Sequence, residues 1–354
     1  MKLTPNPFRG GDGPTFDIGA EVPAPSVDAE APLALLRRCP AYAPTPLVDH
    51  AELANQLGVA ACWIKDERGR MGLGSFKALG AAYVIAHDAM AANPDAPQTA
   101  LAGRTYVTAS AGNHGMSVAA GARVFGARAV VYIADTVPEA FAERLRAKGA
   151  EVVREGAIYE DSMAAAARAA QDKGWQLLSD SSWPGYMDAP HRLMEGYLAL
   201  MAEAFGQVPE SPTHIFLQAG VGGLAGACAA IARDHWGDAP QIIVVEPKAA
   251  PALEASIRAG RFVATQGPAS AMGRLDCKEA SLIALKGLAR DADGFALISE
   301  EEAQEATDAM AAMGFETTPS GVAGLAAALA DHQGLCGLDA ASRVLVILSE
   351  GPEA

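Results

Sequence analysis

The sequence predicts an α/β fold with two open, twisted, mainly parallel sheets that carry helices on both faces. The main observation is that short runs of β-branched and aromatic residues alternate with longer Ala-rich segments of helical spacing. Apolar strands that alternate with helices are typical of parallel sheets covered on both faces. The composition agrees, because 50% hydrophobic and 19% charged residues exclude a mainly disordered chain. The length of 354 residues suggests about two domains.

The elements follow in order along the chain. Roughly the first 30 residues are rich in Pro, Gly and Asp and predict an irregular arm. The charge-free stretch 211–232 contains four glycines, so we interpret it as a buried strand leading into a buried helix and not as a membrane span. The runs with strand character are 61–66, 104–109, 129–134, 214–219, 241–246 and 343–348. The segments with helical character are 75–90, 113–125, 138–148, 159–173 and 321–329.

Charge and cysteine content exclude several classes of protein. Subtracting 42 acids from 27 bases leaves a net charge of −15, so we expect no nucleic-acid partner and no binding to an anionic membrane. Five widely spaced cysteines without a C-x-x-C motif argue against a disulfide framework, and the seven histidines show no paired spacing, so we expect no metal site. The N-terminal segment lacks the apolar core of a signal peptide, and we expect a cytoplasmic protein.

Two glycine-bearing turns, at 108–115 and 218–226, each follow a predicted strand and precede a predicted helix. Ligands of open α/β sheets bind at the carboxyl ends of strands, where these turns lie. Gly220, Gly222 and Gly223 let backbone N–H groups approach an anion, and the next helix adds its positive N-terminal end. We therefore expect phosphate binding at this loop, and the alternative is a tight turn without a ligand.

A dinucleotide site is the second alternative for this loop. Gly220-x-Gly222-x-x-Ala225 satisfies the relaxed dinucleotide fingerprint, and Glu246 ends the next predicted strand. The chain would then be an NAD-dependent oxidoreductase. Two features count against this interpretation: the loop comes late in the chain, and neither the turn at 108–115 nor the lysine described next would have a role.

Lys77 precedes an apolar helical segment and is expected in the first helical turn, with Ser75 as the N-cap. A cation at a helix N-terminus opposes the helix dipole, which is unfavourable unless the amine is neutral or covalently engaged. The sequence therefore singles out Lys77 as a functional candidate. The alternative is an ordinary solvated surface lysine.

Four motifs, taken in order, resemble those of the fold type II pyridoxal phosphate enzymes, the tryptophan synthase β-like group that includes threonine and serine dehydratases. Within this group the chain is most similar to the diaminopropionate ammonia-lyases. The four motifs are Ser75-Phe76-Lys77, the turn 110–114, the loop 220–224 and Ser349-Glu350-Gly351. Further similarity lies in 42–47, 72–80, 180–186, 245–247 and 271–277.

The resemblance implies that pyridoxal 5'-phosphate is the cofactor and that Lys77 forms a Schiff base with it. The freed amine then removes the Cα proton, a role that suits a lysine whose pKa is lowered by burial. Asp180 would position the β-ammonium group of the substrate or assist its departure. The implied cofactor-binding residues are Lys77, Asn113, Gly220, Val221, Gly222, Gly223, Leu224 and Ser349, and the implied carboxylate-binding turn is Ser110, Ala111, Gly112 and His114.

Each of these roles has a plainer alternative. Asn113 is expected at the cofactor's ring hydroxyl but is also a good helix cap, and His114 is more simply structural than catalytic. Ser349 is expected as the neutral partner of the pyridine nitrogen, which favours elimination over transamination, and is otherwise a residue of a strand-end turn. Asp180 is otherwise a turn-forming aspartate.

The resemblance fails at one position. Diaminopropionate ammonia-lyases usually carry an aspartate just before Gly-Asn-His, and this carboxylate is the base for D-substrates. The chain has Ala111 there, as in threonine dehydratases, so we expect a preference for L-substrates.

The expected reaction is α,β-elimination of a small L-amino acid, with 2,3-diaminopropionate giving pyruvate and ammonia. The alternatives with the same site are a dehydratase of L-serine, L-threonine or a 3-hydroxy-amino acid, and a protein that binds the cofactor without catalysis. We expect a small mobile domain at 76–190, a discontinuous large cofactor-binding domain at 1–75 and 191–354, and a homodimer, the last from the family and from symmetry base rates.

Overall fold

The structure is a computed structural model of the whole chain and describes residues 1–11 and 14–352. It contains a larger sheet of seven strands and a smaller sheet of four. In chain order, the larger sheet is built from β1 (Lys2–Pro5), β2 (Leu47–Asp49), β3 (Ala61–Asp66), β8 (His214–Gln218), β9 (Gln241–Pro247), β10 (Gly294–Ile298) and β11 (Arg343–Leu348). The smaller sheet consists of β4 (Thr105–Ala109), β5 (Arg128–Ile133), β6 (Ala150–Arg154) and β7 (Gln176–Leu177).

The larger sheet has the order β1-β10-β9-β8-β11-β3-β2, and its strands are parallel except for β1 and β2 at the two edges. The smaller sheet has the order β6-β5-β4-β7 and is parallel throughout. The predicted α/β class with two mainly parallel sheets is confirmed. All six predicted strands are present, because a continuous apolar run suits a strand buried on both faces.

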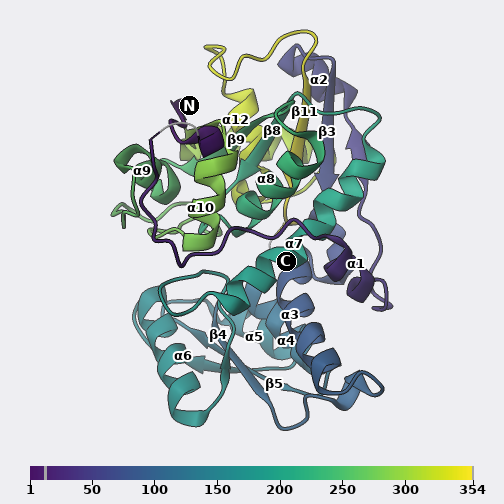
Figure 1. Cartoon of the computed structure of the whole chain (residues 1–354), viewed down its shortest axis with the longest axis vertical. Helices are drawn as coiled ribbons and strands as arrows, with labels where there is room; N and C mark the ends of the chain where they lie inside the picture. Colours follow the sequence, from purple (N-terminus) through teal and green to yellow (C-terminus); the bar gives the residue numbers. More distant parts are fainter. Residues whose placement is uncertain (12–13, 353–354) are drawn as a thin grey trace.

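Helices cover the sheets, and Figure 1 shows the smaller sheet with its helices in the lower half of the molecule and α7 at the junction with the larger sheet. The α-helices are α1 (Glu30–Leu36), α2 (Ala51–Leu57), α3 (Lys77–Ala92), α4 (Asn113–Val124), α5 (Glu139–Ala147), α6 (Tyr159–Lys173), α7 (Asp188–Gln207), α8 (Gly223–Trp236), α9 (Ala252–Ala259), α10 (Leu282–Asp291), α11 (Glu300–Ala312) and α12 (Pro319–Leu329). Short 3-10 helices are η1 (Arg9–Gly11), η2 (Glu67–Gly72) and η3 (Pro97–Thr99).

The prediction of a wholly irregular N-terminal arm is wrong for its first residues. β1 pairs antiparallel with β10 and forms an edge of the larger sheet. The side chain of Asn6 then donates hydrogen bonds to the carbonyls of Ala289 and Ala292 at the end of α10. A four-residue edge strand depends on its partner for hydrogen bonds, so its own composition carries little signal.

The stretch 211–232 forms β8 and the first part of α8, as predicted, and both are buried. Among the described residues, no helix combines the length and the apolar character needed to cross a bilayer.

Candidate active site

Lys77 is placed by pairing between two segments that are far apart in the sequence. The backbone N–H of Phe76 donates to the carbonyl of Ser349 over 3.1 Å, and the N–H of Gly351 donates to that of Gly74 over 3.0 Å. Lys77 is the first residue of α3 and therefore lies near the carboxyl end of β11. The predicted first-turn position is confirmed, but Ser75 is not the N-cap, because Phe76 precedes the helix and Ser75 bridges to Glu350.

Buried charges hold the chain that leads to Lys77. Arg70, in η2, donates to Glu67 over 2.7 Å and to Glu203 of α7 over 2.8 Å, and Lys65 donates to Glu203 over 2.7 Å. All four side chains are at most 4% exposed. The two positive charges of this network are balanced by its two carboxylates, and buried charges are tolerated in a protein interior when they are paired in this way. The network ties η2 to α7 immediately before the lysine.

Asp180 faces Lys77 across the site. Its Oδ2 lies 2.5 Å from Lys77 Nζ, and the two side chains are 18% and 22% exposed. Burial by itself would lower the pKa of Lys77, but the Asp180 carboxylate outweighs it, so the pKa is raised above the ordinary lysine value. Burial would likewise raise the pKa of Asp180, yet the charge of Lys77 holds it well below its usual range. The expectation that burial lowers the pKa of Lys77 is therefore wrong in this structure.

Two further side chains, Tyr197 and Cys277, lie near this pair. Tyr197 of α7 places its ring 5.9 Å from Lys77 Nζ, and burial raises the pKa of its hydroxyl. Burial and the Asp180 carboxylate raise the pKa of Cys277 to about 12, so its thiol stays protonated near neutral pH. Tyr197 lies inside an apolar helix, and nothing in its local sequence indicates a position beside Lys77.

His114 is buried beside the same pair. Its Nε2–H donates to the carbonyl of Leu178 over 2.8 Å, which joins the start of α4 to the segment after β7. Burial holds the pKa of His114 below its ordinary value, so the ring is neutral at neutral pH. The Nδ1 atom is buried and has no partner among the described residues.

The glycine loop lies between β8 and α8. Gly222 has a φ of +96°, a conformation that favours glycine, and it precedes the helix. Among residues 1–11 and 14–352, no acceptor receives a hydrogen bond from the backbone N–H of Gly220, Gly222, Gly223 or Leu224. A Cβ at Gly220 would lie 2.9 Å from Cys277 Sγ, so the loop approaches the residues around Lys77 closely. These amides and the helix N-terminus form a cradle suited to a phosphate.

The structure argues against the dinucleotide interpretation, because the carboxylate of Glu246 is already engaged. Glu246 is fully buried and its two carboxyl oxygens accept hydrogen bonds from the N–H groups of Leu253 and Glu254, each over 2.8 Å. Burial raises its pKa to about 8. Glu246 therefore binds the start of α9 and does not present a carboxylate to a ribose.

The turn after β4 provides the other side of the site. The Ser110 hydroxyl accepts a hydrogen bond from the N–H of Gly112 over 3.2 Å, and Ala111 is half-buried. Gly112 is the residue before α4, so Asn113 is not its cap. Instead, the Asn113 side-chain amide donates to Glu350, whose other oxygen accepts from Thr318 over 2.5 Å. Sequence reasoning missed Glu350, because a glutamate beside Ser349 shows no partner until the chain is folded.

Ser349 lies at the end of β11 and is 5% exposed. Both of its backbone polar groups are hydrogen-bonded. The carbonyl oxygen accepts from the N–H of Phe76, and the N–H donates to the carbonyl oxygen of Gly321 over 3.1 Å. No described residue forms a hydrogen bond with the hydroxyl of Ser349. The structure thus brings Lys77, Asp180, Asn113 and Ser349 to the carboxyl ends of strands from both sheets.

Two buried serines, Ser182 and Ser281, form a hydrogen-bonded joint between two segments, and Ser182 follows Asp180 by two positions. The hydroxyls of Ser182 and Ser281 are 2.7 Å apart, and the Ser182 N–H donates to the Ser281 hydroxyl over 3.2 Å. Ser281 also donates its own N–H to the carbonyl of Val221 in the glycine loop over 2.9 Å. The joint therefore connects the segment that carries Asp180 to the glycine loop.

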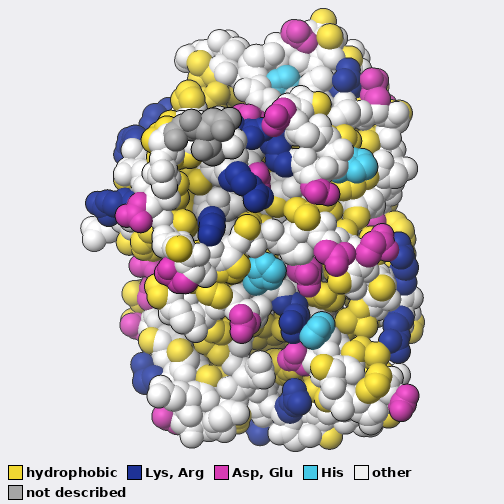
Figure 2. Space-filling model, viewed as in Figure 1, with side chains coloured by type: hydrophobic (Ala, Val, Ile, Leu, Met, Phe, Trp, Pro, Cys, Tyr) yellow, Lys and Arg dark blue, Asp and Glu magenta, His cyan; other side chains and the backbone are white. Residues whose placement is uncertain are grey.

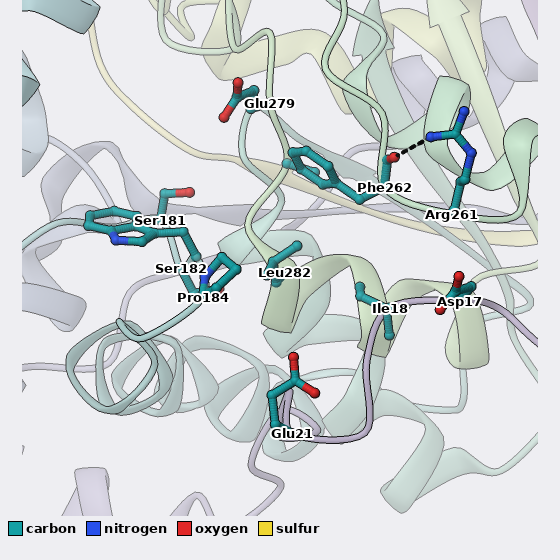
Figure 3. A pocket seen from close by; sticks show the side chains of 12 residues that line it. Asp17, Ile18, Glu21, Ser181, Ser182, Pro184, Arg261, Phe262, Glu279 and Leu282 are labelled. Carbon is teal, nitrogen blue, oxygen red and sulfur yellow. Dashed lines mark hydrogen bonds between the residues drawn. The ribbon is translucent and has the colours of Figure 1, made fainter.

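A cavity of about 410 Å³ lies next to this joint, and its lining among the described residues does not include Lys77, Asn113 or the glycine loop. Figure 3 shows Ser181, Ser182 and Pro184 facing Arg261 and Phe262, with the N-terminal arm closing another side. Figure 2 shows basic and acidic side chains interspersed over the viewed face of the molecule. No group of three His, Cys, Asp or Glu side chains in the described part of the chain could hold a metal ion.

Comparison with known proteins agrees with this geometry. A family model described as pyridoxal-phosphate dependent enzyme matches residues 39–350. The diaminopropionate ammonia-lyase of Salmonella typhimurium is 37% identical over 272 residues, which cover 71% of this chain and 67% of the relative. The Escherichia coli enzyme is 35% identical over 254 residues, which cover 67% of this chain and 63% of the relative, so the matches span about two thirds of these relatives.

A solved structure extends the likeness to nearly the whole chain. The crystal structure of Escherichia coli diaminopropionate ammonia-lyase, in complex with an aminoacrylate–PLP azomethine reaction intermediate, superposes with a TM-score of 0.87 and 29% identity. The superposition covers 99% of this chain and 93% of that one. The family match over most of the chain and the shared fold type II architecture show that this chain belongs to the pyridoxal-phosphate-dependent enzymes.

Proposed function

We propose that the chain catalyses α,β-elimination of a small L-amino acid, and that 2,3-diaminopropionate, converted to pyruvate and ammonia, is its substrate. The observation that carries this proposal is the Lys77–Asp180 pair, in which Nζ and Oδ2 lie 2.5 Å apart beside the glycine loop. At this point the neutral amine of Lys77 can accept a proton, and the ionised carboxylate of Asp180 can orient a cationic leaving group.

The residues present fit pyridoxal phosphate. The free N–H groups of Gly220, Gly222, Gly223 and Leu224, at the N-terminus of α8, would hold the phosphate, and Gly220 has no Cβ to block its approach. Lys77 would hold the aldehyde carbon, Asn113 the ring hydroxyl, and Ser349 the pyridine nitrogen. The bound cofactor supplies an electron sink for the carbanion formed at Cα.

The chain's own residues then handle the protons and the orientation of the substrate. Lys77 Nζ takes the proton from Cα, and Asp180 orients a β-ammonium group and stays ionised while it does so, because the lysine holds its pKa low. The backbone N–H groups of the turn 110–114 receive the α-carboxylate. Ala111 offers no proton acceptor, so Lys77 is the base and L-substrates are preferred.

A hydroxy-amino-acid dehydratase is the second candidate. It is supported by Ala111, which matches the threonine dehydratase pattern. It is also supported by the human L-serine dehydratase/L-threonine deaminase, which is 30% identical over 205 residues, or 57% of this chain and 60% of that protein. The ionised Asp180 favours a cationic leaving group and therefore the ammonia-lyase reaction.

The domain boundaries and the oligomeric state are proposed in the same way. We propose that residues 76–190 form a small mobile domain against a larger one made of 1–75 and 191–354, and that the enzyme is a cytoplasmic homodimer. The four strands of the smaller sheet all lie within 76–190, which supports this boundary.

The decisive experiment is an absorbance titration of the pure holoenzyme, joined to borohydride reduction and peptide mass mapping. We expect a visible cofactor band that changes with L-2,3-diaminopropionate, and a pyridoxyl adduct on Lys77. Lys77→Ala should lose both the band and pyruvate formation. The matched control is Lys278→Ala, because Lys278 also pairs with an aspartate, Asp276, over 2.5 Å and is similarly exposed at 23%.

Side-by-side assays of L-2,3-diaminopropionate, L-serine, L-threonine and 3-hydroxyaspartate choose between the two candidates, and faster turnover of a hydroxyl substrate overturns the ammonia-lyase assignment. A label on another lysine, or a colourless protein with NAD-dependent fluorescence quenching, overturns the cofactor assignment. Retained activity in Lys77→Ala contradicts the role of that lysine.

A further inference from the structure

Arg274 connects the two loops of the site. Its backbone N–H donates to the Ser320 hydroxyl over 3.1 Å, and its carbonyl oxygen lies 3.0 Å from the position of a Cβ on Gly220. The main chain of Arg274 is thus fixed beside the glycine loop.

The side chain of Arg274 reaches the turn after β4, which belongs to the smaller sheet. A Cβ on Gly112 would lie 3.0 Å from the guanidinium carbon and 3.1 Å from Nε and Nη1. The same guanidinium stands 5.7 Å from the ring centre of Phe141 on α5. A Cβ at position 112 would crowd the guanidinium, so glycine leaves room for this approach.

Charge and chemistry at this point favour an anionic group of the substrate. A guanidinium binds a carboxylate with a planar fork of N–H donors. The turn itself carries no acid at position 111, where Ala111 stands. Glu350 contributes a carboxylate 3.9 Å from Arg274 Nε and receives hydrogen bonds from Asn113 and Thr318. Asp180 supplies the negative charge beside Lys77, so the site presents both signs to a zwitterion.

We propose that Arg274 binds the α-carboxylate of the amino-acid substrate together with the backbone amides of the turn 110–114, and so selects amino acids over amides and amines. This inference rests on the proposed function. Its backbone lies beside the glycine loop and its guanidinium lies on the opposite turn, so Arg274 spans the two sheets.

The test uses the holoenzyme and two competitors, L-alanine and L-alaninamide, which differ in the carboxylate charge and have no leaving group. Their inhibition constants are measured in wild type, Arg274→Gln and Arg274→Lys. Wild type should prefer L-alanine, and Arg274→Gln should lose this preference by about tenfold or more, which corresponds to about 1.4 kcal/mol. The loss should appear in the inhibition constant of L-alanine and in the KM of the substrate, with kcat less affected.

Arg274→Lys should restore part of the preference, since it keeps the charge without the fork. The matched control is Arg144→Gln, because Arg144 places its guanidinium 5.8 Å from the same Phe141 ring and should leave the preference unchanged. The visible cofactor band reports separately on the proposed function, and it should persist in every variant.

An unchanged ratio of the two inhibition constants in Arg274→Gln, with the band intact, overturns the role of Arg274 and leaves the proposed function standing. A selective loss of activity on a substrate with a second carboxylate, such as 3-hydroxyaspartate, with the L-alanine preference intact, overturns the α-carboxylate assignment. Absence of the band in wild type overturns the proposed function itself.

Discussion

Lys77 Nζ and Asp180 Oδ2 form a 2.5 Å ion pair between the start of α3 and the segment after β7. The pair makes the lysine more basic than in water, although burial acts in the opposite direction. In the proposed reaction, proton removal from the substrate needs the neutral amine of Lys77, so Asp180 would control how much of this base is available.

Asp180→Asn should lower the pKa of Lys77, because burial remains and the opposing carboxylate is removed. Each unit of pKa changes the fraction of neutral amine about tenfold at a pH below the pKa. In the protein freed of cofactor, the rate at which an amine reagent labels Lys77, followed by peptide mass mapping against pH, should therefore rise about tenfold or more. Asp276→Asn, which removes the partner of Lys278, should leave the labelling of Lys77 unchanged. Equal rates in Asp180→Asn and wild type would show that the carboxylate does not control the amine.

Ala111→Asp should allow turnover of D-2,3-diaminopropionate. The half-buried turn would then carry a carboxylate, which supplies the proton acceptor that alanine lacks. Pyruvate formation from the D-isomer measures this gain, and activity on the L-isomer serves as the internal reference. Ala111→Asn keeps the shape without the base and should give no gain. The idea fails if the asparagine variant gains the same activity, or if neither variant does.

Glu203→Gln should destabilise the fold by about 3–5 kcal/mol, since Arg70 and Lys65 would lose a shared buried partner. Burial would raise the pKa of Glu203, but hydrogen bonds and charge from Arg70 and Lys65 hold it below its usual value. A lowered folded-state pKa stabilises the protein above the unfolded value of about 4.3, and this contribution is lost as the pH falls through the lowered folded-state pKa.

Chemical denaturation at several pH values between neutral and acid checks both points. The wild type should lose stability over this fall in pH more steeply than Glu203→Gln. Glu210→Gln, at a glutamate that is 62% exposed, should change little. A similar effect from both variants would contradict the importance of the buried network.

Ser281→Ala should cost about 1–3 kcal/mol of unfolding free energy, because the buried N–H of Ser182 loses its acceptor and the Ser182 hydroxyl keeps only the N–H of Ile283 as a partner. The double variant Ser182→Ala/Ser281→Ala should cost less than the sum of the two single changes, because the paired hydroxyls are removed together. Thermal unfolding of the wild type, the two single variants and the double variant measures the coupling free energy between the two serines. Strict additivity would mean that the two serines act independently.

Local sequence was sufficient for the elements with a strong pattern. The runs 61–66 and 343–348 were predicted as strands because an apolar run of that length suits a strand that is buried on both faces. In the structure they are adjacent strands of the larger sheet. β1, β6 and β7 are short or partly polar, and their hydrogen bonds come from partners elsewhere, so they were not predicted. The glycine loop and the position of Lys77 at the start of its helix were predicted for the same local reason.

Other features of the site depend on contacts between distant residues. Asn113 and Glu350 are 237 positions apart, and Arg274 reaches Gly112 from another part of the chain. The direction of the Lys77 pKa shift also depends on such long-range contacts. Burial lowers this pKa and the facing Asp180 carboxylate raises it, and only the folded arrangement shows that the carboxylate dominates. Backbone preference and apolar spacing act over a few residues, and they therefore specified the α/β class, the glycine loop and the candidate lysine. Side-chain partners, ionisation and the meeting of the two sheets depend on long-range packing, and for that reason they emerged only from the tertiary structure.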